Sequence, residues 1–208
     1  MSATLTTSVE RGEFKNEPFV DFSRPENRKS MEAALAKVRS EFGREYPLVI
    51  GGRDITTTDK IKSTNPSRPR EVIAVFQKAT ADMANEAVEA AARAFDRWKR
   101  VSAEERVACA YRTADILRKR RFELDAWLVY EIGKTWPEAD ADIAELIDFC
   151  EYYGREELRL SVPQALTPMR GEKNYLRYIP LGVGVIIPPW NFAAAIMGGM
   201  TLAAILTG

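Results

Sequence analysis

Histidine is absent from the 208 residues of this chain, and cysteine occurs only twice. Without histidine, the chain taken alone cannot form a Ser-His-Asp or Cys-His catalytic group or most zinc and iron sites. Cys109 and Cys150 lie far apart without Cys-x-x-Cys spacing, so they indicate neither a disulfide framework nor a zinc site. Both occupy apolar positions of helical repeats, and we expect them to pack as inert side chains.

The chain also lacks an excess of charge, because 30 Lys and Arg residues balance 30 Asp and Glu residues. This balance argues against a nucleic-acid-binding protein. The N-terminus lacks the pattern of a secretory signal, and the apolar run at residues 192–206 is shorter than the roughly 20 residues that span a bilayer. We therefore expect a cytoplasmic protein that binds neither nucleic acid nor a membrane.

Hydrophobic periodicity predicts a helix-rich first part. Helices are expected at residues 30–42, 80–98, 102–117, 122–132 and 137–158, and the helix at 80–98 should bury a stripe from Ala84 to Trp98. A Gly-Gly turn predicts a hairpin of strands 48–50 and 53–55, and a further strand is expected at 72–76. Residues 1–29 should form an extended arm anchored by Phe14, Phe19 and Phe22.

The last part of the chain has a different character, because residues 179–208 contain no charged side chain. A strand is expected at 175–179, and a second one, buried on both faces, at the β-branched run 183–187. A small-residue helix should follow at 193–207. Asn191 stands between two aromatic residues at this junction, where its amide could stabilise developing negative charge or could cap the helix. The residues alone leave both roles open.

The strongest motif of the chain is PLGVGVIIPPWNF at residues 180–192. It closely resembles the signature of the aldehyde dehydrogenase superfamily. Further segments resemble one subgroup, the 1-pyrroline-5-carboxylate dehydrogenases, which oxidise glutamate γ-semialdehyde to glutamate in proline degradation. These segments are NEPFVDFS at 16–23, PENR at 25–28, YPLVIGG at 46–52, NP at 65–66, EADAD at 138–142 and AELIDF at 144–149.

The resemblance implies an α/β fold, the N-terminal part of an aldehyde dehydrogenase. It implies an N-terminal arm and helix at residues 1–45 and a helical and α/β part of the Rossmann-like NAD-binding domain at 46–160. Residues 161–180 would form part of an oligomerisation β-flap, and 181–208 the first core strand and helix of the dinucleotide-binding domain. A homo-oligomer that uses NAD and an aldehyde substrate is therefore expected, with no metal.

The same resemblance assigns roles to individual residues. Asn191 matches the amide that donates to the oxyanion formed when a thiolate attacks the aldehyde. Phe192 resembles an aromatic residue that lines the substrate tunnel. Glu145 matches an acid below that tunnel, where it could face a substrate ammonium group, and a solvated acid is the alternative. The residues that match the strand end beside the nicotinamide and its ribose are Ile187, Pro188, Pro189 and Trp190.

The chain departs from the family pattern in two ways. Ala193 replaces a proline that many members carry after the Pro-Trp-Asn-Phe run, and the pattern stops at Gly208. The family's nucleophilic cysteine, its general-base glutamate and its ribose-binding lysine are expected beyond that point. Neither Cys109 nor Cys150 matches the nucleophile motif, so the 208-residue chain alone is expected to be inactive.

Two alternative functions remain open from the sequence. One is a general or succinate-semialdehyde dehydrogenase, against which Glu145 and the N-terminal arm favour an amino-acid-derived substrate. The other is a non-catalytic interaction module that pairs with other subunits through residues 175–179, because an unpaired strand is a template for association.

Overall fold

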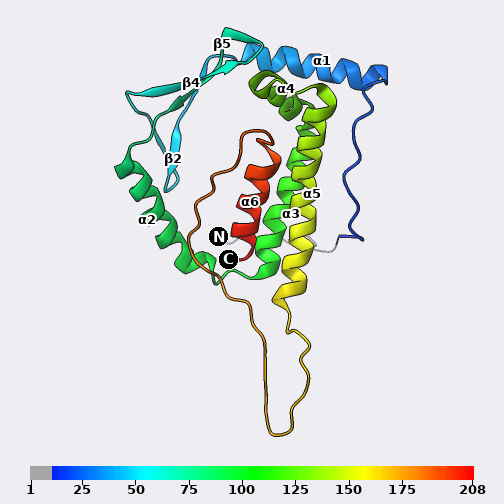
Figure 1. The fold of residues 1–208 in the computed structure, drawn as a ribbon, viewed down its shortest axis with the longest axis vertical. Coiled ribbons are helices and arrows are strands. Elements are labelled where there is room, and N and C mark those ends of the chain that lie inside the picture. The colour runs from blue at the N-terminus through cyan, green and yellow to red at the C-terminus, as the bar shows by residue number, and fades with distance from the viewer. Residues whose placement is uncertain (1–10) are drawn as a thin grey trace, which may run out of the picture.

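Helix α5 (Trp136–Ser161) is the element against which α3 (Ala103–Lys119), α4 (Arg121–Ile132) and α6 (Ala195–Leu206) pack in this computed structural model, which describes residues 11–208 (Figure 1). A complete capping box starts α5: the Thr135 hydroxyl accepts from the Glu138 N–H, and the Glu138 carboxylate accepts from the Thr135 N–H. Pro137 stands in the first turn, where its missing N–H costs no hydrogen bond. The sequence therefore fixes the start of this long helix locally.

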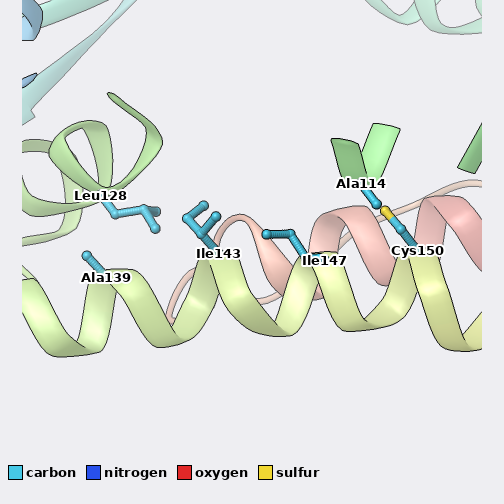
Figure 2. Packing of buried hydrophobic residues seen from close by; sticks show 6 residues of the cluster. All are labelled: Ala114, Leu128, Ala139, Ile143, Ile147 and Cys150. Carbon is cyan, nitrogen blue, oxygen red and sulfur yellow. The ribbon is translucent and has the colours of Figure 1, made fainter. Parts of the chain in front are cut away.

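One face of α5 forms the centre of the core. Its apolar side chains recur every three or four residues and point toward α4 and α3, as Figure 2 shows. Burial of each large aliphatic side chain contributes about 1.5–3 kcal/mol, which makes this seam the main apolar contribution to stability. The helix predicted at 137–158 is confirmed. The cluster comprises Ala114, Leu128, Ala139, Ile143, Ile147 and Cys150.

Helix α6 packs tightly on α5 because two of its residues have no side chain. A Cβ atom added to Gly199 would lie 2.7 Å from the Phe149 ring, and one added to Gly198 would overlap the Leu146 side chain. Any larger residue would push the two helices apart. The small residues of the C-terminal motif thus set the distance between α6 and α5.

Two small sheets precede the helical part. The hairpin of β2 (Leu48–Ile50) and β3 (Arg53–Ile55) turns at Gly51 and Gly52, whose φ angles of 59° and 77° suit glycine. The other sheet has the order β1-β5-β4, in which β5 (Arg68–Gln77) pairs parallel with β1 (Arg44–Tyr46) and antiparallel with β4 (Lys60–Asn65). The hairpin and the strand at 72–76 are confirmed, whereas β1 and β4, which are largely polar, were not expected.

The N-terminal arm leads into α1 (Pro25–Ser40), which packs on α4. Phe22 contacts Phe122 and Trp136, and Phe14 contacts Tyr152, so both act as the expected anchors. Phe19 is 72% exposed, and its predicted anchoring role is wrong. Helix α1 begins five residues earlier than expected, because Pro25 occupies its first turn.

Carboxylates of α5 hold the arm in addition to the aromatic contacts. Asp148 accepts from the Glu17 N–H and from the Asn16 amide, each at 2.7 Å. Asp140 accepts from the Val20 N–H at 2.8 Å. These bonds satisfy backbone groups of a segment that has no secondary structure of its own.

The two strands predicted at 175–179 and 183–187 are absent from the structure. Residues 162–190 instead run away from the end of α5 and back as an extended loop (Figure 1). Val183, Val185 and Ile187 are exposed, so the expectation of a strand buried on both faces is wrong here. A strand needs a neighbouring strand for its backbone hydrogen bonds, and residues 11–208 provide none beside this segment.

The predicted stripe of α2 (Ala81–Trp98) is also not buried. No residue of this helix is buried in the structure, although its apolar side chains recur at helical spacing. Figure 1 shows α2 standing apart from the α3–α5 bundle. Its contacts with other described elements include β2, an ion pair between Glu86 and Arg53 of β3, and a hydrogen bond from the Trp98 ring to the Ile205 carbonyl. Among the residues that the structure describes, no helix is long and apolar enough to cross a membrane.

Asp125 of α4 is a fully buried acid, and neither of its carboxylate oxygens has a hydrogen-bond partner among residues 11–208. Burial, together with the charges of Asp140 and Asp142 and against the opposing charge of Arg121, raises the pKa of this carboxyl from 3.8 to about 8. The folded chain therefore keeps a proton on Asp125 that the unfolded chain releases near pH 3.8. Retention of this proton adds to the free energy of unfolding; the contribution is complete below pH 3.8 and is lost by about pH 8.

Asp125→Asn should remove this pH dependence, because the amide resembles the protonated acid and does not titrate. The free energy of unfolding changes by at most about 1.4 kcal/mol per pH unit for one such group. Between pH 5 and pH 8 the free energy of unfolding of the wild type should therefore fall by up to about 4 kcal/mol relative to that of the variant. Urea unfolding at several pH values measures this difference. Asp59→Asn, at an exposed position, is the control. Parallel pH profiles for wild type and Asp125→Asn would contradict the assignment.

Candidate functional site

Asn191 lies in the turn at residues 191–194, immediately before α6, and its side chain is exposed. The N-cap residue of α6 is Ala194, which makes no side-chain capping bond. The Asn191 amide forms no hydrogen bond with any other residue of the described chain, so the expectation that it could cap the helix is wrong. Its donor N–H groups are free to bind a ligand oxygen.

Asp142 of α5 caps α6 in place of Asn191. Its Oδ1 accepts from the Ala195 N–H at 2.7 Å, and its Oδ2 accepts from the Lys134 ammonium at 2.8 Å. Asp142 is fully buried and the Lys134 side chain is 11% exposed. A carboxylate at a helix N-terminus is favoured by the partial positive charge of the helix dipole.

Lys134 also contacts the motif directly. Its ammonium group lies 4.1 Å from the centre of the Phe192 ring, a cation–π distance. Lys134 follows Gly133, whose left-handed conformation ends α4 and turns the chain toward α5. The end of α4, the start of α5 and the start of α6 thus meet beside Phe192.

The four residues expected to contact a cofactor form the open side of this junction. Ile187 is 80% exposed and Trp190 is 79% exposed, while Pro188 is partly buried. Trp190 also lines a cavity of about 420 Å³ together with Pro66, Glu131, Ile132 and Ala193. The segment therefore offers an apolar surface and unpaired backbone groups next to Asn191, while Pro189 offers no N–H.

Glu145 lies on the exposed face of α5, one turn after Asp142. Its carboxylate forms no hydrogen bond or ion pair with another residue of the described range 11–208. The structure therefore brings Phe192 beside Lys134 but leaves Glu145 facing solvent. A free carboxylate at this position is available to a cation from outside the described chain.

Sequence reasoning missed Lys134 and Asp142 as functional candidates. The sequence could have indicated Asp142, because this acid directly precedes Ile143 on the apolar face of α5. An acid at such a position is expected to be buried, and a buried charge needs a partner. Lys134 gave a weaker signal, since a basic residue after a helix-ending glycine is common. Their mutual contact depends on the turn between α4 and α5.

Cys150 does not lie in a nucleophile-like environment. Burial raises the pKa of the Cys150 thiol to about 12, and the neighbouring charge of Glu151 contributes further. Cys109 is partly exposed, with its sulfur 3.1 Å from Nη2 of Arg112. Among the described residues, no group of three acidic, cysteine or histidine side chains could hold a metal ion.

Comparison with known proteins identifies the relatives of this chain. A family model described as the aldehyde dehydrogenase family matches residues 54–208. A 1-pyrroline-5-carboxylate dehydrogenase of Geobacillus thermodenitrificans is 52% identical over 195 residues, which cover 94% of this chain and 38% of that protein. A 1-pyrroline-5-carboxylate dehydrogenase of Halalkalibacterium halodurans is 50% identical over the same shares.

Solved structures agree with these relatives. A Thermus 1-pyrroline-5-carboxylate dehydrogenase with bound NAD superimposes with a TM-score of 0.91 at 46% identity, over 97% of this chain and 39% of that one. The NAD-bound enzyme of Mycobacterium tuberculosis gives a TM-score of 0.80 at 27% identity, over 98% and 38%. The chain thus spans less than two fifths of the length of these relatives, and the expected α/β fold class is confirmed.

The two thiols should differ sharply toward an alkylating reagent. Iodoacetamide at neutral pH should label Cys109 in the folded chain and leave Cys150 unmodified, because a buried thiol with a raised pKa supplies almost no thiolate. Peptide mass spectrometry measures both sites. Labelling of both in urea is the control, and rapid native labelling of Cys150 would contradict its assignment to the core.

Proposed function

Because this chain belongs to the aldehyde dehydrogenase family, we propose that the complete gene product oxidises L-glutamate γ-semialdehyde to L-glutamate with NAD, in proline degradation. The observation that carries the proposal is the free amide of Asn191 at the end of an open apolar segment. Relatives named 1-pyrroline-5-carboxylate dehydrogenase that match 94% of the chain support the choice of substrate.

Asn191 acts as the donor to the oxyanion. Attack of a thiolate on the aldehyde carbon places a negative charge on the carbonyl oxygen, and Asn191 Nδ2 donates to that oxygen. One such donor in a site that excludes water lowers the barrier by about 3 kcal/mol. Trp190 and Phe192 flank the amide along the chain, and because both are exposed in residues 11–208, the rest of the complete gene product must exclude water from it. The thiolate comes from a cysteine outside the 208 residues, since Cys150 is buried in the core and Cys109 does not match the family's motif.

The residues beside Asn191 fit the nicotinamide end of NAD. Ile187 and Trp190 present exposed apolar surface on which a flat ring can lie. Backbone carbonyls of this extended segment are unpaired within residues 11–208 and can accept from ribose hydroxyl groups. Pro188 and Pro189 stiffen the segment and keep its shape. NAD supplies the two-electron acceptor when it is bound.

Phe192 and Glu145 provide the substrate contacts. The Phe192 ring packs against the aliphatic part of the aldehyde, and the free carboxylate of Glu145 attracts its ammonium group. The charge of Lys134 does not repel that group, because Asp142 neutralises it at 2.8 Å. A general or succinate-semialdehyde dehydrogenase would not need an acid at position 145, which makes those substrates the weaker alternative.

The extended segment at 161–180 is proposed as part of an oligomerisation flap, with further copies of the protein as partners. Tyr175 and Ile179 are large exposed side chains, and an open backbone beside them can pair with another strand. Of the N-terminal part at 1–45, the described residues 11–45 then form the arm and first helix, while 46–160 and 181–208 belong to the NAD-binding domain. Two free cysteines suit a reducing compartment, so we place the protein in the cytoplasm.

Asn191→Ala in the complete gene product should lower kcat by about 100- to 1,000-fold with a small change in KM, because the amide contributes mainly in the transition state. NAD reduction with glutamate γ-semialdehyde measures this loss. Asn174→Ala, an exposed asparagine of the extended loop, is the matched control. Retention of more than half of the wild-type rate in Asn191→Ala would overturn the oxyanion assignment.

Glu145→Gln should raise KM for glutamate γ-semialdehyde by about tenfold, which corresponds to one charge-assisted contact of about 1.4 kcal/mol. For propionaldehyde, which has no ammonium group, KM should stay the same. Glu156→Gln, an acid farther along α5, is the control. Equal changes for both aldehydes would favour a general aldehyde dehydrogenase.

A further inference from the structure

The buried ion pair of Lys134 and Asp142 contacts the motif on the C-terminal side of Asn191 at two points. Lys134 lies over the ring of Phe192, the next residue along the chain. Asp142 accepts from the N–H of Ala195, four residues after Asn191. Lys134 lies in the turn between α4 and α5, and Asp142 lies in the second turn of α5, which begins with a complete capping box.

We propose that Lys134 and Asp142 are positioning residues that hold the Asn191 amide in the geometry required for oxyanion binding. The inference rests on the proposed function, because it assigns to this pair a role that acts through Asn191. Their contacts in residues 11–208 reach Phe192 and Ala195 on either side of the start of α6.

Position 142 needs a carboxylate because both of its oxygens act as hydrogen-bond acceptors. Each oxygen accepts from a different donor, one a backbone N–H and the other an ammonium group. An asparagine would place an NH₂ group against one of these donors and lose that bond. A buried ammonium without its partner would then seek water, and Lys134 would leave the Phe192 ring.

The pair also keeps the Asn191 side chain from capping α6. Asparagine is a strong helix cap, and an uncapped first turn of α6 would compete for its side chain. Since Asp142 occupies that turn, the Asn191 side chain has no acceptor role to fill within the described chain. Loss of Asp142 would allow Asn191 to turn back and cap α6, which would remove the amide from the substrate.

A double-mutant cycle between Asp142→Asn and Asn191→Ala tests the proposal in the complete gene product. Asp142→Asn alone should lower kcat by at least tenfold while KM for aldehyde and for NAD stays within threefold. Added to Asn191→Ala, it should lower kcat by less than twofold further, because the amide through which it acts is already gone. Residues that act through one another show such non-additive effects.

Asp140→Asn is the matched control, since Asp140 is equally buried on the same helix but holds Arg121 and the N-terminal arm. Its effect on kcat should be the same in both backgrounds, and its main effect should be on the unfolding temperature. Lys134→Met is a second probe that keeps the cap of α6 intact. It should also lower kcat on its own and have almost no further effect on kcat in the Asn191→Ala background. It serves in the same cycle if Asp142→Asn does not fold.

The outcomes separate this inference from the proposed function. One outcome is that Asn191→Ala lowers kcat as expected, while Asp142→Asn or Lys134→Met, added to it, lowers kcat by its full factor again. In that case the pair has only a structural role and the inference is wrong. If either single variant keeps the wild-type kcat, the inference is also wrong. If Asn191→Ala itself is fully active, the proposed function fails first, and the positioning role fails with it.

Discussion

Buried carboxylates on α5 join the parts of this chain that lie far apart in sequence. Asp140 binds the arm at Val20 and Arg121 of α4, and Asp142 binds Lys134 and the start of α6. Glu151 pairs with Arg11, Arg118 and Arg155. A buried charge is tolerated only when it is paired, so removal of one partner typically costs about 3–5 kcal/mol. Separate carboxylates on this one helix therefore order the arm and fix the helix that follows Asn191.

This arrangement separates two demands on the C-terminal motif. The start of α6 needs a cap, and the proposed chemistry needs an amide that is not engaged in the protein. Asp142 provides the cap from another helix, so Asn191 can stay open to a ligand. Gly198 and Gly199 contribute by allowing α6 to approach α5 closely enough for that bond to form. The chemistry of the motif thus depends on residues about fifty positions earlier in the chain.

Elements with strong local signals could be predicted from the sequence, and elements that depend on distant partners could not. The apolar spacing of α5 and the helix-ending Gly133 predicted the bundle because each acts within a few residues. The run at 183–187 has the composition of a buried strand, but its burial requires neighbouring strands that residues 11–208 do not supply. The same reason leaves the apolar face of α2 exposed.

For the candidate site, the sequence identified Asn191 and Phe192 through their resemblance to a family motif, while the contact of Lys134 with Asp142 is a tertiary fact. The most direct test is a crystal structure of the complete gene product with NAD. The account predicts that Asp142 accepts from the Ala195 N–H, that Lys134 lies over Phe192, and that the Asn191 amide points into the site without a partner in the protein. An Asn191 side chain that caps α6, with Asp142 turned away, would contradict it.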